Sequence, residues 1–333
     1  MGIQHRLASL CFPLFVERLV GTDGHHGGIN ILMYHEVLPD SMNMPLWHVV
    51  RESEFRRQME YLKKHCDVLS IDEAVEILTS PTKSGAGSRR KIVITFDDGY
   101  SGNYSTAMPI MAELGLPWTV YVATSAVEGG DRYWYDDIAH ALLVAPDRSR
   151  TIATSKGDVQ FQRFDISESR VWLAVHKSLE LLKLLPAEER DRLARQMHEY
   201  VDENPLEMMT PEQIAVLAEA SEVIVGCHTH DHNLLDMVTL DHARQSIEDA
   251  QQRLDSWCGS RPRHFSYPNG NFNGQVVNLV DKFGFDSAVT TESRMAIPGD
   301  HLLKLPRIAV GRFDNLNLFR AKLTFALKPD SSF

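Results

Sequence analysis

Short apolar runs alternate along this chain with segments of helical periodicity, and this alternation constrains the fold more than any other feature. The apolar runs are typical of strands, over residues 29–35, 91–96, 118–123, 222–226, 264–267 and 285–290. Helical patterns lie between many of them, over about 53–62, 70–80, 104–114, 240–258 and 274–283. Strands that alternate with helices form parallel βαβ units. The sequence therefore predicts an α/β fold with a parallel sheet.

One stretch of the chain departs from this alternation. Residues 131–210 carry helical patterns, over 171–185 and 187–201, and few strand signals. Clear strand patterns resume after it, so we interpret it as a helical insertion and not as an independent domain. The 333 residues suit one large α/β barrel or two ordinary domains. We expect a single domain over 1–333, with an N-terminal extension over 1–28.

The N-terminal extension carries a short apolar run from Leu7 to Val16. Pro13 interrupts this run, Glu17 and Arg18 follow it, and no small-x-small cleavage site is present, so it is a poor signal peptide. It is also too short to span a bilayer. We expect a cytoplasmic protein whose extension forms a short amphipathic helix, packed on the body or in peripheral contact with a membrane.

The charge and the cysteines exclude several classes of protein. The formal net charge is −11, with no long basic run, which argues against nucleic acid as a partner. The four cysteines show neither metal-type spacing nor a disulfide framework, which is typical of reduced thiols in a cytosol-like compartment. The oligomeric state is left open.

Two adjacent carboxylates follow the strand pattern at 91–96. Asp97 and Asp98 stand directly after it and precede Gly99. Asp-Asp-Gly is ordinary turn chemistry, so a plain turn is one interpretation. The other is catalytic, because active sites of α/β folds are built at the carboxyl ends of strands. Two acids there can divide the work, one binding a cation and the other taking a proton.

Three histidines follow a second predicted strand, at 222–226. They are His228, His230 and His232. Histidine is the commonest metal ligand at neutral pH, and His228 and His232 can converge on one ion through a helical turn or a tight loop. With one carboxylate from the first strand end they form an Asp-His-His site, which leaves positions open for water and substrate. A histidine-rich surface loop and a three-histidine site are the alternatives.

The two motifs together resemble those of the polysaccharide deacetylases, the NodB homology domain of carbohydrate esterase family four. Thr95-Phe-Asp97-Asp98-Gly99 is similar to the first family motif, and His228-Thr-His-Asp-His232 to the second. The resemblance covers about residues 29–326. It implies a distorted (β/α) barrel of about seven parallel strands.

The resemblance also implies the role of each motif residue. Asp97 takes the place of the catalytic base, while Asp98, His228 and His232 take the places of the metal ligands. The implied cofactor is one divalent ion, with zinc expected and cobalt, nickel or manganese as alternatives. The backbone N–H of Tyr100 takes the place of the oxyanion donor.

The third motif departs from the family pattern of Arg-Pro-Pro-Tyr/Phe-Gly. This chain has Ser266-Tyr267-Pro268-Asn269-Gly270, so Ser266 stands where an arginine orients the base. Arg263 and Arg312 are the candidates to replace that arginine. Tyr267 and Pro268 fit a wall of the substrate groove.

The late Leu-x-His motif that supplies the general acid is missing, because no histidine follows His301. However, Met33-Tyr-His35-Glu36 is similar to the early histidine of circularly rearranged members that act on exopolysaccharides. His35 is therefore the candidate acid, and a histidine that only completes a strand end is the alternative. The segment at 305–312 resembles the last strand of the same subgroup.

The resemblance implies hydrolysis of N-acetyl groups on an amino sugar in a polysaccharide, oligosaccharide or precursor. Trp47, Trp134 and Tyr135 stack on sugar rings or belong to the core. Three other functions stay open: a metal amidohydrolase for another acyl group or sugar, an inactive glycan-binding module, and a two-histidine, one-carboxylate iron oxygenase. The carboxylate precedes the histidines here, which is the reverse of the usual oxygenase order.

Overall fold

The computed structural model describes residues 28–42, 44, 46–80, 89–129, 132–144, 150–161, 175, 178–198 and 206–325. The N-terminal extension expected at 1–28 lies outside these residues except for Gly28, and so does the run at 7–16 with its expected helix and membrane contact. None of the helices in the described ranges is long and apolar enough to cross a membrane.

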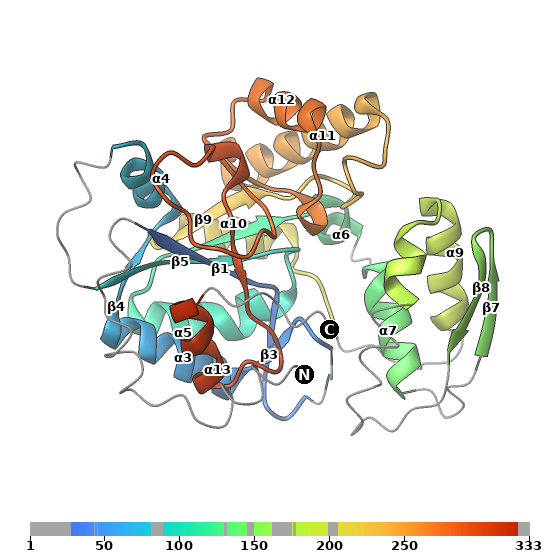
Figure 1. Ribbon diagram of the computed structural model, residues 1–333, viewed down its shortest axis with the longest axis horizontal. Coiled ribbons are helices and arrows are strands. Elements are labelled where there is room, and N and C mark those ends of the chain that lie inside the picture. The colour runs from blue at the N-terminus through green and yellow to red at the C-terminus, as the bar shows by residue number, and fades with distance from the viewer. Residues whose placement is uncertain are drawn as a thin grey trace.

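A parallel sheet of eight strands forms the centre of the molecule (Figure 1). Its strands are β1 (Ile29–Tyr34), β4 (Cys66–Leu69), β5 (Arg90–Phe96), β6 (Trp118–Val122), β9 (Val223–Cys227), β10 (His264–Ser266), β11 (Ser287–Val289) and β12 (Ile308–Ala309). Seven of them run in the order β11-β10-β9-β6-β5-β1-β12, and β4 pairs with the first half of β5. A parallel bridge from Val289 to Leu305 connects β11 with the segment that leads into β12. The predicted distorted barrel is therefore confirmed.

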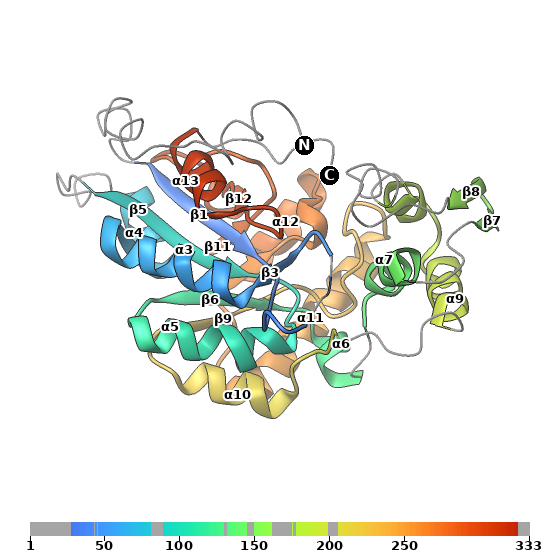
Figure 2. The same cartoon turned by 90° about the horizontal axis from the view of Figure 1, so that it is seen from below.

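Helices cover the outside of this sheet, with α3, α5 and α10 along one side in Figure 2. The helices of the barrel are α3 (Glu52–His65), α4 (Ile71–Thr79), α5 (Met108–Leu114), α6 (Thr124–Gly129), α10 (Pro211–Glu219), α11 (Leu240–Cys258), α12 (Gly274–Lys282) and α13 (Leu316–Phe325). Ser70 caps α4 in a capping box with Glu73. The helix α3 begins at Glu52, next to its N-cap residue Arg51, and the Ser53 hydroxyl donates to Asp40.

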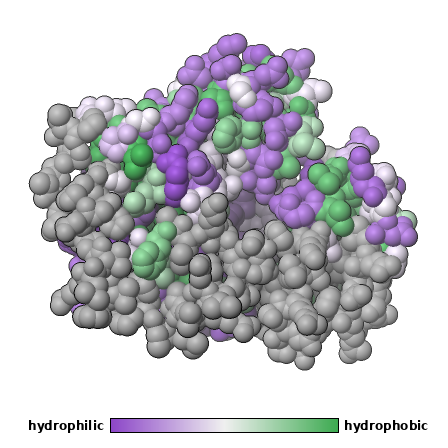
Figure 3. All heavy atoms as spheres, in the orientation of Figure 1, coloured by the Kyte–Doolittle hydropathy of each residue, from purple (hydrophilic) through white to green (hydrophobic). Residues whose placement is uncertain are grey.

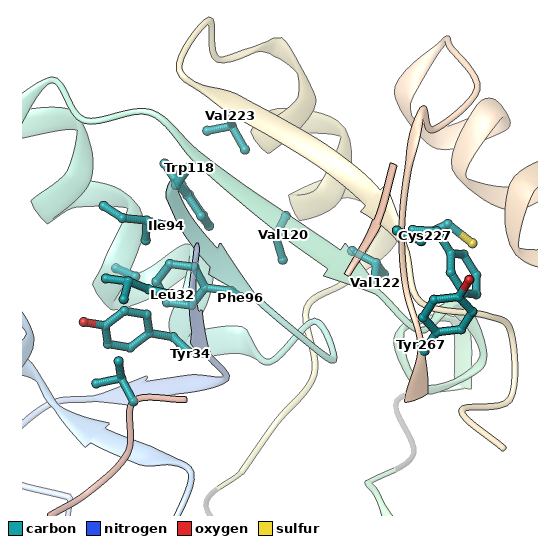
Figure 4. Close-up of a cluster of buried hydrophobic side chains, with 14 of the residues drawn as sticks. Leu32, Tyr34, Ile94, Phe96, Trp118, Val120, Val122, Val223, Cys227 and Tyr267 are labelled. Carbon is teal, nitrogen blue, oxygen red and sulfur yellow. The ribbon is translucent and has the colours of Figure 1, made fainter. Parts of the chain in front are cut away.

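The period-two alternation of the strands separates two apolar layers. Leu32, Tyr34, Ile94 and Phe96 point to one side and pack side by side in the cluster of Figure 4, which extends to the surrounding helices. Residues from the opposite faces of the same strands, such as Val93 with Tyr121 of β6, belong to a second cluster. Hydrophilic residues prevail over α11 and α12 on the face in Figure 3, so these helices are amphipathic.

The insertion stands beside the barrel as a separate group of elements (Figures 1 and 2). It comprises α7 (Trp134–Val144), helical residues at 178–183, and α9 (Ala187–His198). It also contains an antiparallel hairpin of β7 (Arg150–Thr154) and β8 (Gly157–Phe161), which the sequence analysis did not predict. The reason is that β7 is mostly polar, so it lacks the apolar pattern of a buried strand.

Candidate active site

Asp98, His228 and His232 come together at the carboxyl ends of β5 and β9. The Oδ1 atom of Asp98 lies 3.3 Å from the Nε2 atom of His228 and 3.3 Å from that of His232. Asp98 and His228 are almost completely buried, while His232 is partly exposed. Strand ends that lie far apart in the sequence thus place three donor atoms around one point.

The backbone around these residues takes a conformation that side chains rarely adopt. The φ angles are 80° at Asp98, 67° at Thr229 and 53° at His232. The hydroxyl of Thr229 accepts a hydrogen bond from the His232 N–H at 3.1 Å, which stabilises the turn. A tight loop, and not a helical turn, therefore brings the two histidines together. Strained positions of this kind cluster at functional sites.

The hydrogen bonds of the histidines decide which nitrogens face the centre. His228 donates from Nδ1 to the carbonyl of Ser266 at 2.7 Å, which leaves Nε2 as the nitrogen that faces Asp98. His230 takes no part, since its ring contacts the Thr124 hydroxyl at 2.9 Å. The two outer histidines of this loop therefore approach Asp98, while His230 contacts Thr124.

Charge and burial oppose each other at this centre. Burial acts against the charged form of Asp98, yet its pKa is held well below the usual value by His232 and His228. Burial also acts to lower the pKa of His228, but Asp97 and Asp98 outweigh it and raise this pKa. Two imidazole nitrogens and one carboxylate oxygen, all within 4.8 Å of one another, are the donor set of an open metal site. The group therefore fits a divalent ion.

The partner of Asp97 is Arg307, and neither of the candidates from the sequence. Arg307 donates from Nη1 to Oδ1 at 2.7 Å and from Nη2 to Oδ2 at 2.6 Å. Arg263 instead pairs with Asp286 and Asp72, and Arg312 donates to the Met44 carbonyl. Arg307 belongs to the segment at 305–312, so the resemblance of that segment was the signal that could have identified it.

Ser266 also takes part in this arrangement. Its hydroxyl donates to Oδ2 of Asp97 at 3.2 Å and accepts a hydrogen bond from Nη2 of Arg307 at 3.0 Å. The serine that replaces the family arginine thus joins the same carboxylate from β10, while the guanidinium reaches it from the segment that leads into β12. Burial opposes ionisation of Asp97, but Arg307 and His228 lower its pKa, so it is a carboxylate at neutral pH.

His35 follows β1 and lines the same cavity as Asp97 and Asp98. Its Nδ1 atom is buried and has no hydrogen-bond partner within the described ranges. Burial lowers the pKa of His35 against the opposing charges of Asp98 and Asp97. The structure thus brings the candidate acid to the candidate base, with an imidazole that is neutral at pH 7.

Tyr100, Tyr267 and Pro268 are all buried. The Tyr100 hydroxyl donates to Oδ2 of Asp136 at 2.6 Å, and the Tyr267 hydroxyl donates to the Leu303 carbonyl at 3.0 Å. The roles expected for the Tyr100 N–H and for Tyr267 and Pro268 stay predictions. The neighbour of Pro268, Asn269, lines the cavity.

The insertion contributes contacts that the sequence analysis did not foresee. Tyr135 donates from its hydroxyl to Oδ2 of Asp98 at 3.0 Å, and Tyr133 donates to the Asp98 carbonyl at 2.8 Å. His48 lies on Tyr100 with ring centroids 5.4 Å apart, and its Nε2 atom is 3.3 Å from Oδ1 of Asp136. Burial lowers the pKa of His48 to about 3, so it is a neutral side chain.

A cavity of about 470 Å³ opens over this centre, between the barrel and the insertion. Its walls include Trp47 and Trp134, together with the residues His35, His48, Asp97, Asp98, Tyr135, Lys183, Arg190, His228, His232, Asn269 and Arg312. This size lies in the range of ligand sites. The sequence did not decide whether Trp47, Trp134 and Tyr135 belong to the core or stack on sugar rings. All three line the cavity.

Known proteins resemble this chain in sequence and in fold. The family model for polysaccharide deacetylase matches residues 84–160 and 182–288. YxkH of Bacillus subtilis (strain 168), whose name describes a polysaccharide deacetylase, is 22% identical over 282 residues, which are 84% of this chain and 70% of that protein.

Two solved structures share the fold. IcaB from Ammonifex degensii matches with a TM-score of 0.57 and 17% identity, over 90% of this chain and 97% of that one. The Streptococcus pyogenes deacetylase PplD, solved in complex with acetate, matches with a TM-score of 0.52 and 19% identity, over 87% of this chain and 96% of that one.

Proposed function

The chain belongs to the polysaccharide deacetylase family, and on that premise we propose that it is a metal-dependent hydrolase that removes N-acetyl groups from an amino sugar. The substrate is a polysaccharide, an oligosaccharide or a glycan precursor. The observation that carries the proposal is that Asp97, paired with Arg307, lines one cavity together with Asp98, His228 and His232. A buried carboxylate, ionised and oriented, thus lies next to a group that fits a divalent ion.

Asp98, His228 and His232 would hold the ion, with zinc as the expected metal and cobalt, nickel or manganese as alternatives. Bound there, the ion supplies Lewis acidity, which lowers the pKa of water and polarises the acetyl carbonyl. Two imidazoles and one carboxylate are the ligand set of several catalytic zinc sites. Tyr135 orients the carboxylate of Asp98 through the oxygen that does not contact the histidines.

The chain's own groups then move the protons. Asp97 takes a proton from the attacking water as the C–O bond forms. The backbone N–H of Tyr100 donates to the oxygen that becomes negative in the tetrahedral state. His35, which is neutral in the free protein, must first take up a proton. It then delivers this proton to the nitrogen as the C–N bond breaks, because an amide nitrogen leaves poorly unless it is protonated. The products are acetate and a free amine.

The test is acetate release from a panel of N-acetylated sugars and oligosaccharides, with and without a chelator. We expect release from at least one member, loss of release with chelator and recovery when zinc is added back. The same sugars with N-formyl or N-propionyl groups test whether the enzyme removes another acyl group instead. If the metal-loaded protein binds glycans but releases no acid from any panel, the chain is a glycan-binding module and the proposal is wrong.

A further inference from the structure

Arg190 of the insertion is a buried cation in the wall of the cavity. It lies on α9, its residue is only 8% exposed, and it lines the cavity with Asp97 and Asp98. Burying a guanidinium is costly unless its charge is paired and its N–H groups are bonded. The partners of this side chain therefore show whether the protein alone satisfies it.

The protein satisfies Arg190 only in part. Nη2 donates to the side-chain carbonyl of Asn233 at 2.9 Å, and the guanidinium lies 5.3 Å from the ring centroid of Trp134. The Nε atom is buried without a hydrogen-bond partner within the described residues. No ion pair within 4.0 Å joins Arg190 to a carboxylate in that part of the chain, and burial lowers its pKa against the opposing charges of Asp191 and Asp231.

The two lysines that line the cavity, Lys183 and Lys322, differ from Arg190 in this respect. Lys183 contacts Glu180 at 2.6 Å, and Lys322 contacts Asp314 at 2.7 Å. Arg307, beneath the cavity, is paired with Asp97. Each of these charges has its carboxylate within the protein. The positive charge of Arg190 is therefore available to something that enters the cavity.

Arg190 also lies beside the reactive centre. Its partner Asn233 directly follows His232, and the ring under its guanidinium, Trp134, directly precedes Tyr135. Tyr135 in turn donates to Asp98. The guanidinium thus contacts the neighbours of two residues at the metal group, on a rigid aromatic surface.

We propose that Arg190 binds an anionic group of the substrate, a carboxylate or a phosphate, so that the substrate is an N-acetylated amino sugar with an acidic substituent near its acetamido group. This inference rests on the proposed deacetylase function. A guanidinium presents paired N–H donors that match both kinds of oxyanion. The net charge of −11 disfavours a polyanion, so a single acidic group on the sugar is the class that fits.

The test compares matched substrates in the metal-loaded enzyme. N-Acetylglucosamine is the neutral probe, N-acetylmuramic acid carries a carboxylate, and N-acetylglucosamine 1-phosphate carries a phosphate. We expect the wild type to deacetylate one acidic probe with a kcat/KM about 10- to 100-fold above the neutral one, the usual worth of a hydrogen-bonded charge. Arg190→Gln should remove this preference by raising KM for the acidic probe, and Arg190→Lys should restore part of it.

Arg192→Gln is the matched control, because Arg192 stands on the same helix with a side chain 61% exposed. It should leave every probe unchanged. Equal loss of activity on neutral and acidic probes in Arg190→Gln, or no preference in the wild type, would overturn the inference. If no probe releases acetate, the proposed deacetylase function is wrong. Calorimetric binding of the acidic probes to wild type and Arg190→Gln then still decides the role of Arg190.

Discussion

The two adjacent aspartates show how single residues acquire different tasks. Asp97 points to Arg307 and Ser266, while Asp98, one residue further and at positive φ, points to His228 and His232. The sequence predicts that the two strand ends meet at one site, because both strand-end motifs are visible in the chain. Arg307 was missed, although it lies in the segment at 305–312, since the pairing of residues 210 positions apart is set by the closure of the barrel.

Arg307→Lys should lower kcat by about 10- to 1000-fold while the metal stays bound. Lysine keeps the charge but offers a single donor group, so the two-pronged contact that orients Asp97 is lost. Because Asp97 and Arg307 act as a unit, adding Asp97→Asn to Arg307→Lys should cost little beyond Asp97→Asn alone. The check is kcat of the two single variants and the double variant, each with its metal content. Full activity in Arg307→Lys, or additive losses, would contradict this role.

Tyr135→Phe should weaken metal binding by about 10- to 100-fold, the usual effect of removing a group that orients a ligand. The phenol donates to Oδ2 of Asp98 at 3.0 Å, and phenylalanine keeps the ring without the donor. Competition with a chelator of known zinc affinity measures the change. Tyr104→Phe is the control, because Tyr104 lies in the helical turn Asn103–Ala107 that precedes α5 and does not line the cavity. Equal zinc affinity of wild type and Tyr135→Phe would show that the hydrogen bond does not support the ion.

At the scale of elements, the short parallel pair of β2 (Glu36–Leu38) and β3 (Val49–Arg51) supports one wall of the cavity. Glu36 is fully buried, and its carboxyl accepts hydrogen bonds from the N–H groups of Val37 and Gly102. A Cβ atom on Gly102 would lie 2.0 Å from Oε1 of Glu36, so this close approach requires glycine. Burial raises the pKa of Glu36 to about 8.

Glu36→Gln should flatten the dependence of stability on pH between about 4.5 and 8. The folded state keeps the Glu36 proton up to a pKa of about 8, whereas the unfolded state releases it near 4.5. The native state therefore binds more protons in this window, and the free energy of unfolding falls as pH rises. Glutamine resembles the protonated acid and has no proton to lose. Urea unfolding of both proteins at several pH values tests this, and an unchanged slope would contradict it.

Element boundaries show where sequence patterns succeed and where they fail. Buried strands such as β5 were predictable, because their continuous apolar runs end in polar residues. The strand β4 was missed, since its four residues join two helices and pair with only half of β5. The β7–β8 hairpin was missed because mostly polar residues form it. Packing position, and not local pattern, defines such elements.

At the scale of the whole molecule, the site is shared between two parts of the chain. The barrel provides Asp97, Asp98 and the histidines, and the insertion provides Tyr133, Tyr135 and Arg190. Motifs predicted the barrel's part, because strand ends converge by the rules of the fold. They could not predict the insertion's part, since nothing in a helical pattern states which residues will meet a site elsewhere.

The measurement that tests the central claim most directly is acetate release by Asp97→Asn at full metal occupancy. The account predicts that Asp97→Asn binds metal as the wild type does and loses about 10²- to 10⁴-fold in kcat, the usual contribution of one acid–base group. His228→Gln, measured beside it, should instead lose the metal. Full activity of metal-loaded Asp97→Asn would contradict the account, because the proton of the attacking water would then go elsewhere.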